Sequence, residues 1–258
     1  MKKSGLSQET LKIIACVTML IDHIGAAVLA RLLMVNGLGE LDQTNTDAIM
    51  QWLSANGALY WMYTVMRMIG RVAFPIFCFL LVEGFLHTHD VKKYAMRLGL
   101  FALLSEIPFD LAFSSKILEF NYQNVFFTLF IGLLTMIAYR AVEEKEEWNQ
   151  ALKVILYILI VAAGMALAYF LKTDYAEKGV FCIMVLYIFR KKKMWQIIAG
   201  CASFIWETPA LFGFIPIAFY NGTRGWKMKY FFYIFYPAHL LILYLLCYFM
   251  GISGYSAV

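Results

Sequence analysis

Apolar residues run along this chain in long blocks, and polar residues gather between the blocks. The blocks are rich in Leu, Ile, Phe and Ala without two-residue alternation, so they predict helices and not the strands of a membrane barrel. Segments with the apolar character of membrane spans are 11–34, 73–87, 96–113, 124–139, 152–171, 179–189, 194–206, 209–220 and 230–250. The runs 194–206 and 209–220 are each short for a crossing at a rise of about 1.5 Å per residue. The polar stretch 36–56, and 60–69 as a short partial helix, are expected not to cross.

The composition excludes most other classes of protein. Of 258 residues, 62% are apolar or aromatic and 15% are charged, against about 45–50% and about 25% in soluble domains. The chain is therefore predicted to be an all-α, polytopic transmembrane bundle of about nine spans (eight to ten) forming a single domain, 1–258. The five cysteines lie inside apolar segments without CxxC spacing, so no disulfide framework and no metal site is expected.

The net charge of +5 is explained mostly by topology. Lys and Arg gather beside span ends on one side, which the positive-inside rule makes cytoplasmic, together with the N-terminus. Sixteen of the 22 fall there: Lys2, Lys3, Lys12, Lys92, Lys93, Arg97, Arg140, Lys145, Lys153, Arg190, Lys191, Lys192, Lys193, Arg224, Lys227 and Lys229. Arg31, Lys116, Lys172 and Lys178 fall outside, and Arg67 and Arg71 at membrane depth. No nucleic-acid partner is needed to explain the charge.

Ionisable residues inside the predicted spans are the strongest functional signal, because each costs a few kcal/mol in hydrocarbon. They are Asp22, His23, Glu83, His87, Glu106, Asp110 and His239, with Arg71 at the mouth of the second span and Glu207 between the two short runs. Lys12 and His23 are eleven residues apart, about three turns and roughly 16 Å along a helix, so they share one face. Asp22 is offset by about 100° and cannot orient His23. A partner from another helix is expected, with Glu83, Glu106 and Asp110 as candidates.

Structural interpretations remain open beside these functional ones. His23 could form only an interhelical hydrogen bond, and Arg71 could be half of a structural ion pair with Glu83 or Glu106. His87 fits a solvated residue near the interface. Lys92 and Lys93 fit topology anchors, with phosphate binding second, and His239 could plug the kink at Pro237 or touch substrate.

Several polar motifs inside apolar segments resemble the TraX family, membrane proteins named for acetylation of the pilin amino terminus. The matching motifs are LKIIA at 11–15, IDHIG at 21–25, GRVAFPIF at 70–77, EGF at 83–85, SEIPFD at 105–110, YNG at 220–222, RG at 224–225 and YPAH at 236–239. They cover nearly the whole chain.

The first span also resembles that of the acyltransferase-3 enzymes, where an arginine, ten residues and a histidine mark the path of the acyl donor. Lys12 replaces the arginine here, which keeps the charge and loses the bidentate fork. The resemblance implies cytosolic acetyl-CoA, whose phosphates meet a basic mouth and whose pantetheine arm reaches a catalytic His23. The candidate CoA-binding cations are Lys12, Arg71, Lys92, Lys93, Arg97 and Arg224. Arg71 could instead stabilise an oxyanion or hold an acceptor carboxylate.

The expected function is therefore an acetyltransferase of the bacterial inner membrane. His23 is the expected general base, and Asp22, Glu83, Glu106 and Asp110 complete the catalytic candidates. The lipid bilayer is an expected partner, and the acceptor stays open between the amine of a pilin-like protein, a glycan and a small molecule. The alternative class is a secondary transporter with ionisable residues along its substrate path. A scaffold or sensor without chemistry is disfavoured by the density of buried charges.

Overall fold

The protein is helical throughout the part that the structure describes. The computed structural model describes residues 4–225 and 229–256, and within these ranges it contains helices and two isolated β-bridges. Lys2, Lys3 and Lys227, which the topology prediction includes, lie outside the described residues. The predicted all-α class is confirmed.

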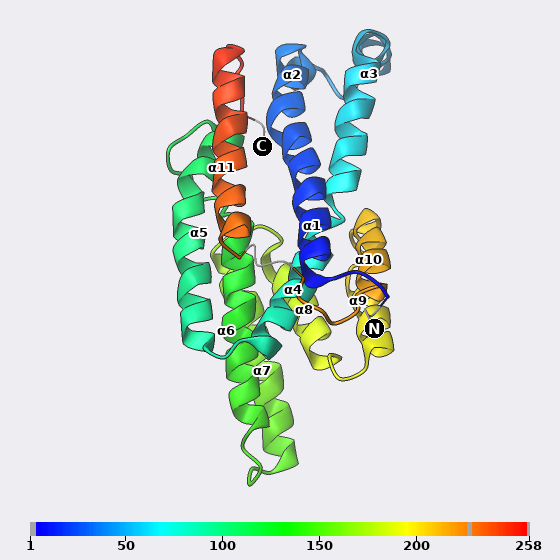
Figure 1. Cartoon of the computed structure of the whole chain (residues 1–258). Coiled ribbons are helices and arrows are strands. Elements are labelled where there is room, and N and C mark those ends of the chain that lie inside the picture. The colour runs from blue at the N-terminus through cyan, green and yellow to red at the C-terminus, as the bar shows by residue number, and fades with distance from the viewer. Residues whose placement is uncertain (1–3, 226–228, 257–258) are drawn as a thin grey trace.

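The described chain contains eleven α-helices, one π-helical segment and two 3-10 segments (Figure 1). In order they are α1 (Gln8–His23), η1 (Ile24–Leu29), α2 (Ala30–Val35), η2 (Leu38–Glu40), α3 (Thr46–Gly70), α4 (Ala73–His87), α5 (Val91–Ser114), α6 (Val125–Glu143), α7 (Gln150–Phe170), α8 (Ala176–Ile188), α9 (Lys193–Ser203), η3 (Thr208–Gly213), α10 (Phe214–Ala218) and α11 (Lys229–Phe249).

The first predicted span is one continuous rod of 28 residues, from Gln8 to Val35. Ser7 begins it as an N-cap, because its hydroxyl accepts a hydrogen bond from the Thr10 amide at 3.2 Å. The rod changes to π-helical geometry over Ile24–Leu29, directly after His23. Such π segments are rare and often occur at functional sites. The rod therefore places its irregular turn next to the predicted catalytic histidine.

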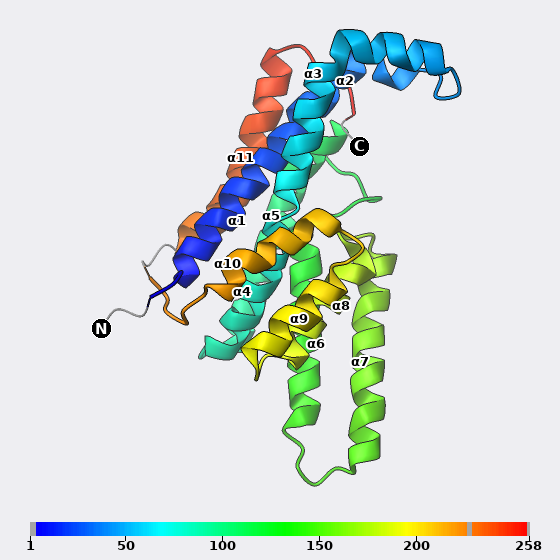
Figure 2. The same ribbon diagram turned by 90° about the vertical axis from the view of Figure 1, so that its right-hand side faces the viewer.

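The second helical stretch differs from the prediction. A 25-residue helix, α3, occupies Thr46–Gly70, where a polar loop and a short partial helix were expected. Asn45 starts it by accepting the Ala48 amide at 3.1 Å. The prediction was wrong because exposed apolar side chains, such as Trp61 at 65% exposure, share this helix with a polar N-terminal half. Helix α3 packs along α1, and α4 follows after a turn at 71–72 (Figure 2).

The two short runs near residue 200 form a hairpin. Helix α9 leads to a turn at residues 204–207, and η3 and α10 return along α4 (Figure 2). The Lys193 ammonium donates to the carbonyls of Ala218 and Tyr220, both at 2.7 Å, so the hairpin starts and ends at the same end of the bundle. Helix α9 has 11 residues, which is shorter than the about 20 residues of a typical transmembrane helix.

By length and composition, four described segments can cross a membrane: Gln8–Val35, Thr46–His87, Val125–Glu143 and Gln150–Phe170. The count of about nine spans stays a prediction. Helix α7 shows the expected lipid-facing character, since Ile158 and Leu159 are 64% and 57% exposed.

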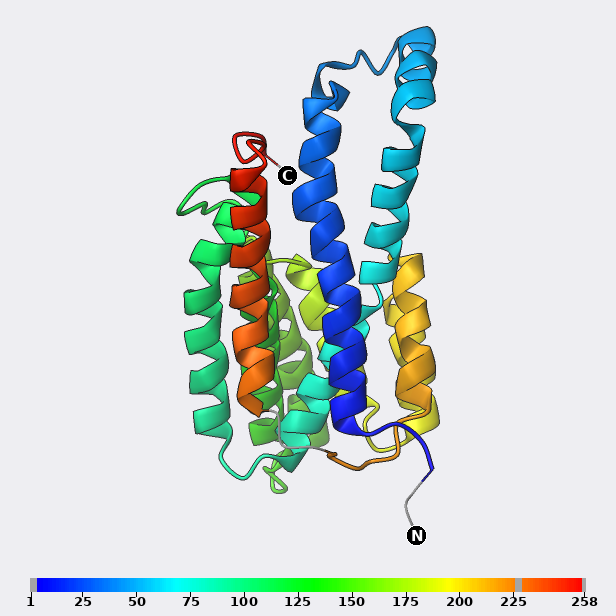
Figure 3. The same cartoon turned by 45° about the horizontal axis from the view of Figure 1, so that its top comes forward.

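The ends of the helices give the bundle a polarity. The α4–α5, α6–α7 and α8–α9 connections lie at the end where α1 begins, at the bottom of Figure 3. Most of the predicted cytoplasmic Lys and Arg residues belong to these connections and the adjoining helix ends. Two apolar cores support the bundle: one is centred on α4, α6 and α8, and the other joins α11 to α5 and the first rod.

Candidate functional site

A large cavity of about 680 Å³ opens among α1, α4, α5, α6 and α11. Its lining at one end comes from the first turns of α1, the α4–α5 connection and residues 224–225. Lys12, Arg97 and Arg224 face this space, and Glu9 is the anionic residue in the lining. With the histidines neutral, this lining carries a charge of +2, which favours an anionic ligand. Deeper in, the walls are apolar: Leu80, Leu81, Leu98, Phe126 and Leu129.

Local backbone pairing brings Arg224 to this cavity. The Glu9 amide donates to the Arg224 carbonyl at 3.1 Å, so the chain after α10 lies against the start of α1. Gly225 adopts φ +85°, and a Cβ there would meet Ser7 and Glu9. Only glycine fits this close approach without strain, which explains the Arg-Gly pair in the sequence.

The cations at this entrance are only partly neutralised. Lys12 lies 3.4 Å from Glu9, and an Arg224 guanidinium nitrogen donates to the His87 carbonyl at 3.2 Å. The Nε atom of Arg97 is buried and has no hydrogen-bond partner in the described chain. A buried unpaired donor of this kind costs free energy unless a ligand satisfies it.

A small polar cavity of about 100 Å³ lies beyond the large one. His23 and Asp22 of α1 line it together with Arg67 of α3 and Arg71. Its aromatic lining is Tyr63, Phe74, Phe77, Phe109, Phe113, Tyr122 and Tyr175. Asp174 adds a second carboxylate, so two carboxylates and two guanidinium groups balance in this lining.

Ion pairs fix the charged residues of the small cavity. Asp22 Oδ2 accepts from Arg67 at 2.8 Å, and a Cβ at Gly70 would overlap the Asp22 side chain. Gly70 therefore lets the end of α3 approach α1 closely enough for this pair. Arg71 pairs with Glu207, from the tip of the α9–α10 hairpin, at 3.1 Å.

The other carboxylate of the small cavity belongs to the α7–α8 turn. The Tyr122 hydroxyl donates to Asp174 Oδ1 at 2.8 Å. The Thr128 hydroxyl donates to the Asp174 carbonyl, which ties this turn to α6. The turn therefore holds a fixed acid at the wall of the cavity.

His23 pairs with a second histidine, from the last helix. His23 Nδ1 lies 2.6 Å from Nε2 of His239. This separation is too short for face-to-face contact, and the ring planes differ by 7°. The rings therefore meet edge to edge in a hydrogen bond. Phe113 and Tyr236 pack edge-on against the His23 ring.

The two cavities are neighbours that share part of their lining. Met19, Phe77 and Val125 line both of them. Lys12 lines the large cavity and His23 the small one, so the path from Lys12 to His23 along one face of α1 stays a prediction.

The remaining predicted cations divide between the two cavities and the surface. Arg97 and Arg224 gather with Lys12, whereas Arg71 lines the small cavity. Lys92 and Lys93 line neither cavity, and Lys93 pairs with Asp90 at 3.1 Å.

The expectation that a carboxylate orients the His23 ring is wrong, because the ring nitrogen bonds His239. Glu106 Oε2 instead accepts from the Asn124 backbone and side chain. Asp110 Oδ2 accepts from the Glu119 amide at 2.8 Å. Glu83 lies 3.8 Å from His87. These three carboxylates line neither cavity, since interhelical packing points them elsewhere.

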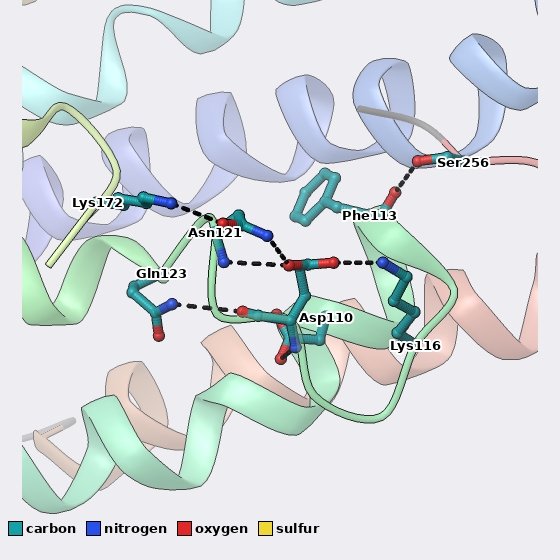
Figure 4. Close-up of polar contacts among 8 residues, drawn as sticks. Asp110, Phe113, Lys116, Asn121, Gln123, Lys172 and Ser256 are labelled. Carbon is teal, nitrogen blue, oxygen red and sulfur yellow. Dashed lines mark hydrogen bonds and ion pairs between the residues drawn. The ribbon is translucent and has the colours of Figure 1, made fainter.

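Asp110 belongs to a polar network that organises the α5–α6 loop (Figure 4). Glu119 pairs with Lys116 at 2.5 Å and accepts from Asn121, whose amide oxygen binds Lys172 at 2.6 Å. The hydrogen bond from Lys116 lowers the pKa of the Glu119 carboxyl to about 2. The network fixes the loop between Phe113 and Tyr122, two residues of the small cavity.

Arg31, counted above with the outer cations, is fully buried. Its guanidinium donates to the carbonyls of Ala27 at 2.8 Å and Tyr255 at 2.9 Å, and to the Ser115 hydroxyl at 2.9 Å. It therefore joins the first rod to the end of α5 and to the C-terminal segment.

Sequence reasoning gave no site role to Asp174, Arg67 or His239. Arg67 was placed at membrane depth without a role, and His239 was left between kink and substrate. The YPAH motif was the available signal for His239. In the described ranges, no group of three or more His, Cys, Asp or Glu residues is arranged to hold a metal ion.

The apolar helices and the enclosed charged cavities define the class: a multi-helix membrane protein. The model of the TraX protein family matches residues 7–247, and the chain belongs to the TraX family. The chain is also similar to the probable fimbrial assembly protein FimC, serogroup H1, of Dichelobacter nodosus. The two are 27% identical over 208 residues, covering 71% of this chain and 83% of the relative. No solved structure matches the chain.

Proposed function

We propose that this TraX-family protein is an integral-membrane acyltransferase. It moves an acetyl group from cytosolic acetyl-CoA to an amine or hydroxyl of an acceptor, with His23 as the general base. One observation carries the proposal: His23 lines a small polar cavity that shares the lining residues Met19, Phe77 and Val125 with a wide, cation-lined one. Two substrates that enter from different spaces would meet at that histidine.

The large cavity has the properties that an acyl-CoA requires. Its volume of about 680 Å³ falls within the usual range for small-molecule sites. Lys12, Arg97 and Arg224 would hold the phosphates, and the unpaired Arg97 Nε would gain a partner. The apolar walls beyond them suit the pantetheine arm.

The chemistry needs one base at the junction. His23 Nε2 would accept the proton of the acceptor amine or hydroxyl as that nitrogen or oxygen attacks the thioester carbonyl. The carbon–sulfur bond breaks, and the imidazolium returns the proton to the sulfur. Products are the acetylated acceptor and free CoA, and His23 is neutral again.

The positions of the two cavities indicate from which side each substrate would arrive. The cationic entrance lies at the end rich in basic connections, which is the cytoplasmic end under the positive-inside rule of an inner-membrane protein. The acceptor would approach past the α5–α6 loop and the α7–α8 turn, which supply Tyr122 and Asp174. Acetyl-CoA then never needs to cross the bilayer. Because the FimC relative is described as a fimbrial assembly protein, a pilin-type protein amine is the first acceptor to test.

The test measures thiol release. Purified protein in lipid nanodiscs receives acetyl-CoA with either a pilin-type peptide bearing a free amino terminus or hydroxylamine. Free CoA is measured with a thiol reagent and the product by mass spectrometry. His23→Ala should lower the rate by about 10²–10⁴-fold, while Gln43→Ala, an exposed change, should not.

Wild-type protein that releases no CoA with any nucleophile would contradict the proposal and favour the transporter alternative. Full activity of His23→Ala would remove the histidine from the mechanism.

A further inference from the structure

The partner of His23 has its own hydrogen-bond constraint. His239 Nδ1 lies 2.7 Å from the backbone carbonyl oxygen of Phe235. A carbonyl oxygen can only accept, so the proton of this hydrogen bond belongs to His239 Nδ1. One ring nitrogen of His239 is therefore assigned as a donor by its surroundings.

This assignment passes to His23. A neutral histidine carries one ring proton, so with Nδ1 protonated the Nε2 atom of His239 is an acceptor. The hydrogen bond at 2.6 Å then requires His23 Nδ1 to donate. A neutral His23 with its proton on Nδ1 has a bare Nε2.

The charged alternative is disfavoured by the surroundings. An imidazolium at His239 could donate from both nitrogens, but His239 is only 5% exposed and packs against Phe235 and Tyr236. Asp22, the carboxylate next to His23 in the sequence, is paired with Arg67 and does not serve as a counter-ion for His239. Arg67 and Arg71 line the same cavity as His23, so a further cation there would be repelled.

We infer that His239 is a positioning residue, which holds His23 in the Nδ1–H tautomer and so presents the Nε2 lone pair to the small cavity. The inference rests on the proposed function for its catalytic meaning. His23 lines the small cavity, and within the described residues no hydrogen bond is found to its Nε2 atom. Orientation of a base by a second group on its other nitrogen is the usual way to fix a tautomer.

The tautomer can be measured without any activity. The chain has four histidines, so nitrogen NMR of protein labelled at histidine gives few signals, assigned by His87→Gln and His89→Gln. His23 should show a protonated Nδ1 and a bare Nε2. His239→Leu should move the His23 proton toward Nε2, and His239→Gln, which keeps an acceptor near the position of Nε2, should not. A wild-type His23 protonated on Nε2 overturns the inference even if His239→Leu does not fold.

Kinetic measurements then distinguish a positioning role of His239 from a purely structural one. His239→Leu should lower kcat by about 10–100-fold at an unchanged KM for acetyl-CoA, since it alters the base and not the donor entrance. His239→Gln should recover most of kcat. A loss of kcat with an unaltered His23 tautomer would overturn the positioning role. If the tautomer is as inferred but no variant or wild-type sample releases CoA, the proposed function fails and the assignment stands.

Discussion

The two cavities differ in width and in how their charges are satisfied. The large one holds about 680 Å³ and an excess of cations, with the Nε atom of Arg97 left without a partner in the described residues. The small one holds about 100 Å³, and its two guanidinium groups are each ion-paired. The excess positive charge of the large cavity attracts a flexible anion, whereas the ion pairs of the small cavity keep its charged side chains in fixed positions. The first space is suited to capture and the second to chemistry.

The largest expected effect comes from closing the junction between them. Met19 lines both cavities, so Met19→Trp should fill the space between them and lower kcat/KM for acetyl transfer by about 100-fold or more. Binding of adenosine 3′,5′-bisphosphate, the nucleotide part of CoA, should be unchanged by calorimetry. Met62→Trp, an exposed change on α3, is the matched control. Unimpaired transfer by Met19→Trp would show that the two spaces do not work together.

The next effect tests the ion pair between Asp22 and Arg67 in the small cavity. Asp22→Asn removes the partner of Arg67 and should lower the free energy of unfolding by about 2 kcal/mol, because a partly buried guanidinium loses its counter-ion. Steric trapping in bicelles measures this loss. The double variant Asp22→Asn/Arg67→Gln should lose much less free energy of unfolding than the sum of the losses of the two single variants.

Glu40→Gln, an exposed acid, is the control for this cycle. Additive losses for Asp22 and Arg67 would mean that the small cavity is not held by this pair.

A smaller effect should separate capture from chemistry. Arg97→Gln removes a cation of the large cavity and should raise the KM for acetyl-CoA by about tenfold, with kcat nearly unchanged. Initial rates over a range of acetyl-CoA concentrations measure it. Lys145→Gln, in the α6–α7 connection at the same end, changes the net charge equally and should leave KM alone. A fall in kcat alone would place Arg97 in the chemical step.

The smallest effect concerns the loop beside the small cavity. Because its pKa is lowered to about 2 in the folded protein, mainly by the hydrogen bond from Lys116, Glu119 stabilises the fold above its ordinary pKa of about 4.3. That contribution shrinks as the pH falls from there toward 2. The Tm difference between wild type and Glu119→Gln should therefore be larger at pH 6 than at pH 3. A constant difference would contradict the pairing of Glu119 with Lys116.

Much of the site was accessible from the sequence because it depends on helix periodicity. Lys12 and His23 lie eleven residues apart on one helix, so their common face follows from the helical repeat. Arg97 and Arg224 were recognisable as cations near span ends. Lys92 and Lys93 fit the same pattern but line neither cavity, because the sequence does not tell which side of a helix end faces the interior.

Helix α3 shows where local pattern failed in the fold. Its N-terminal half is polar and exposed, so it resembles a loop by composition. It is nevertheless helical, capped by Asn45 and tied to Asn36 by hydrogen bonds from Trp52 and with Asn56. Tertiary packing outweighs weak local preference in such a segment.

The sequence by itself determined the class of the protein, a helical membrane protein of the TraX family, and the residue on which its proposed chemistry depends. Only the tertiary structure decided the partner of that residue. His239 is 216 residues from His23 along the chain, and it was chosen over three carboxylates that were equally plausible by spacing. Periodicity fixes which residues share a helix face, but contacts between helices depend on how whole faces pack, and that is a property of the complete fold.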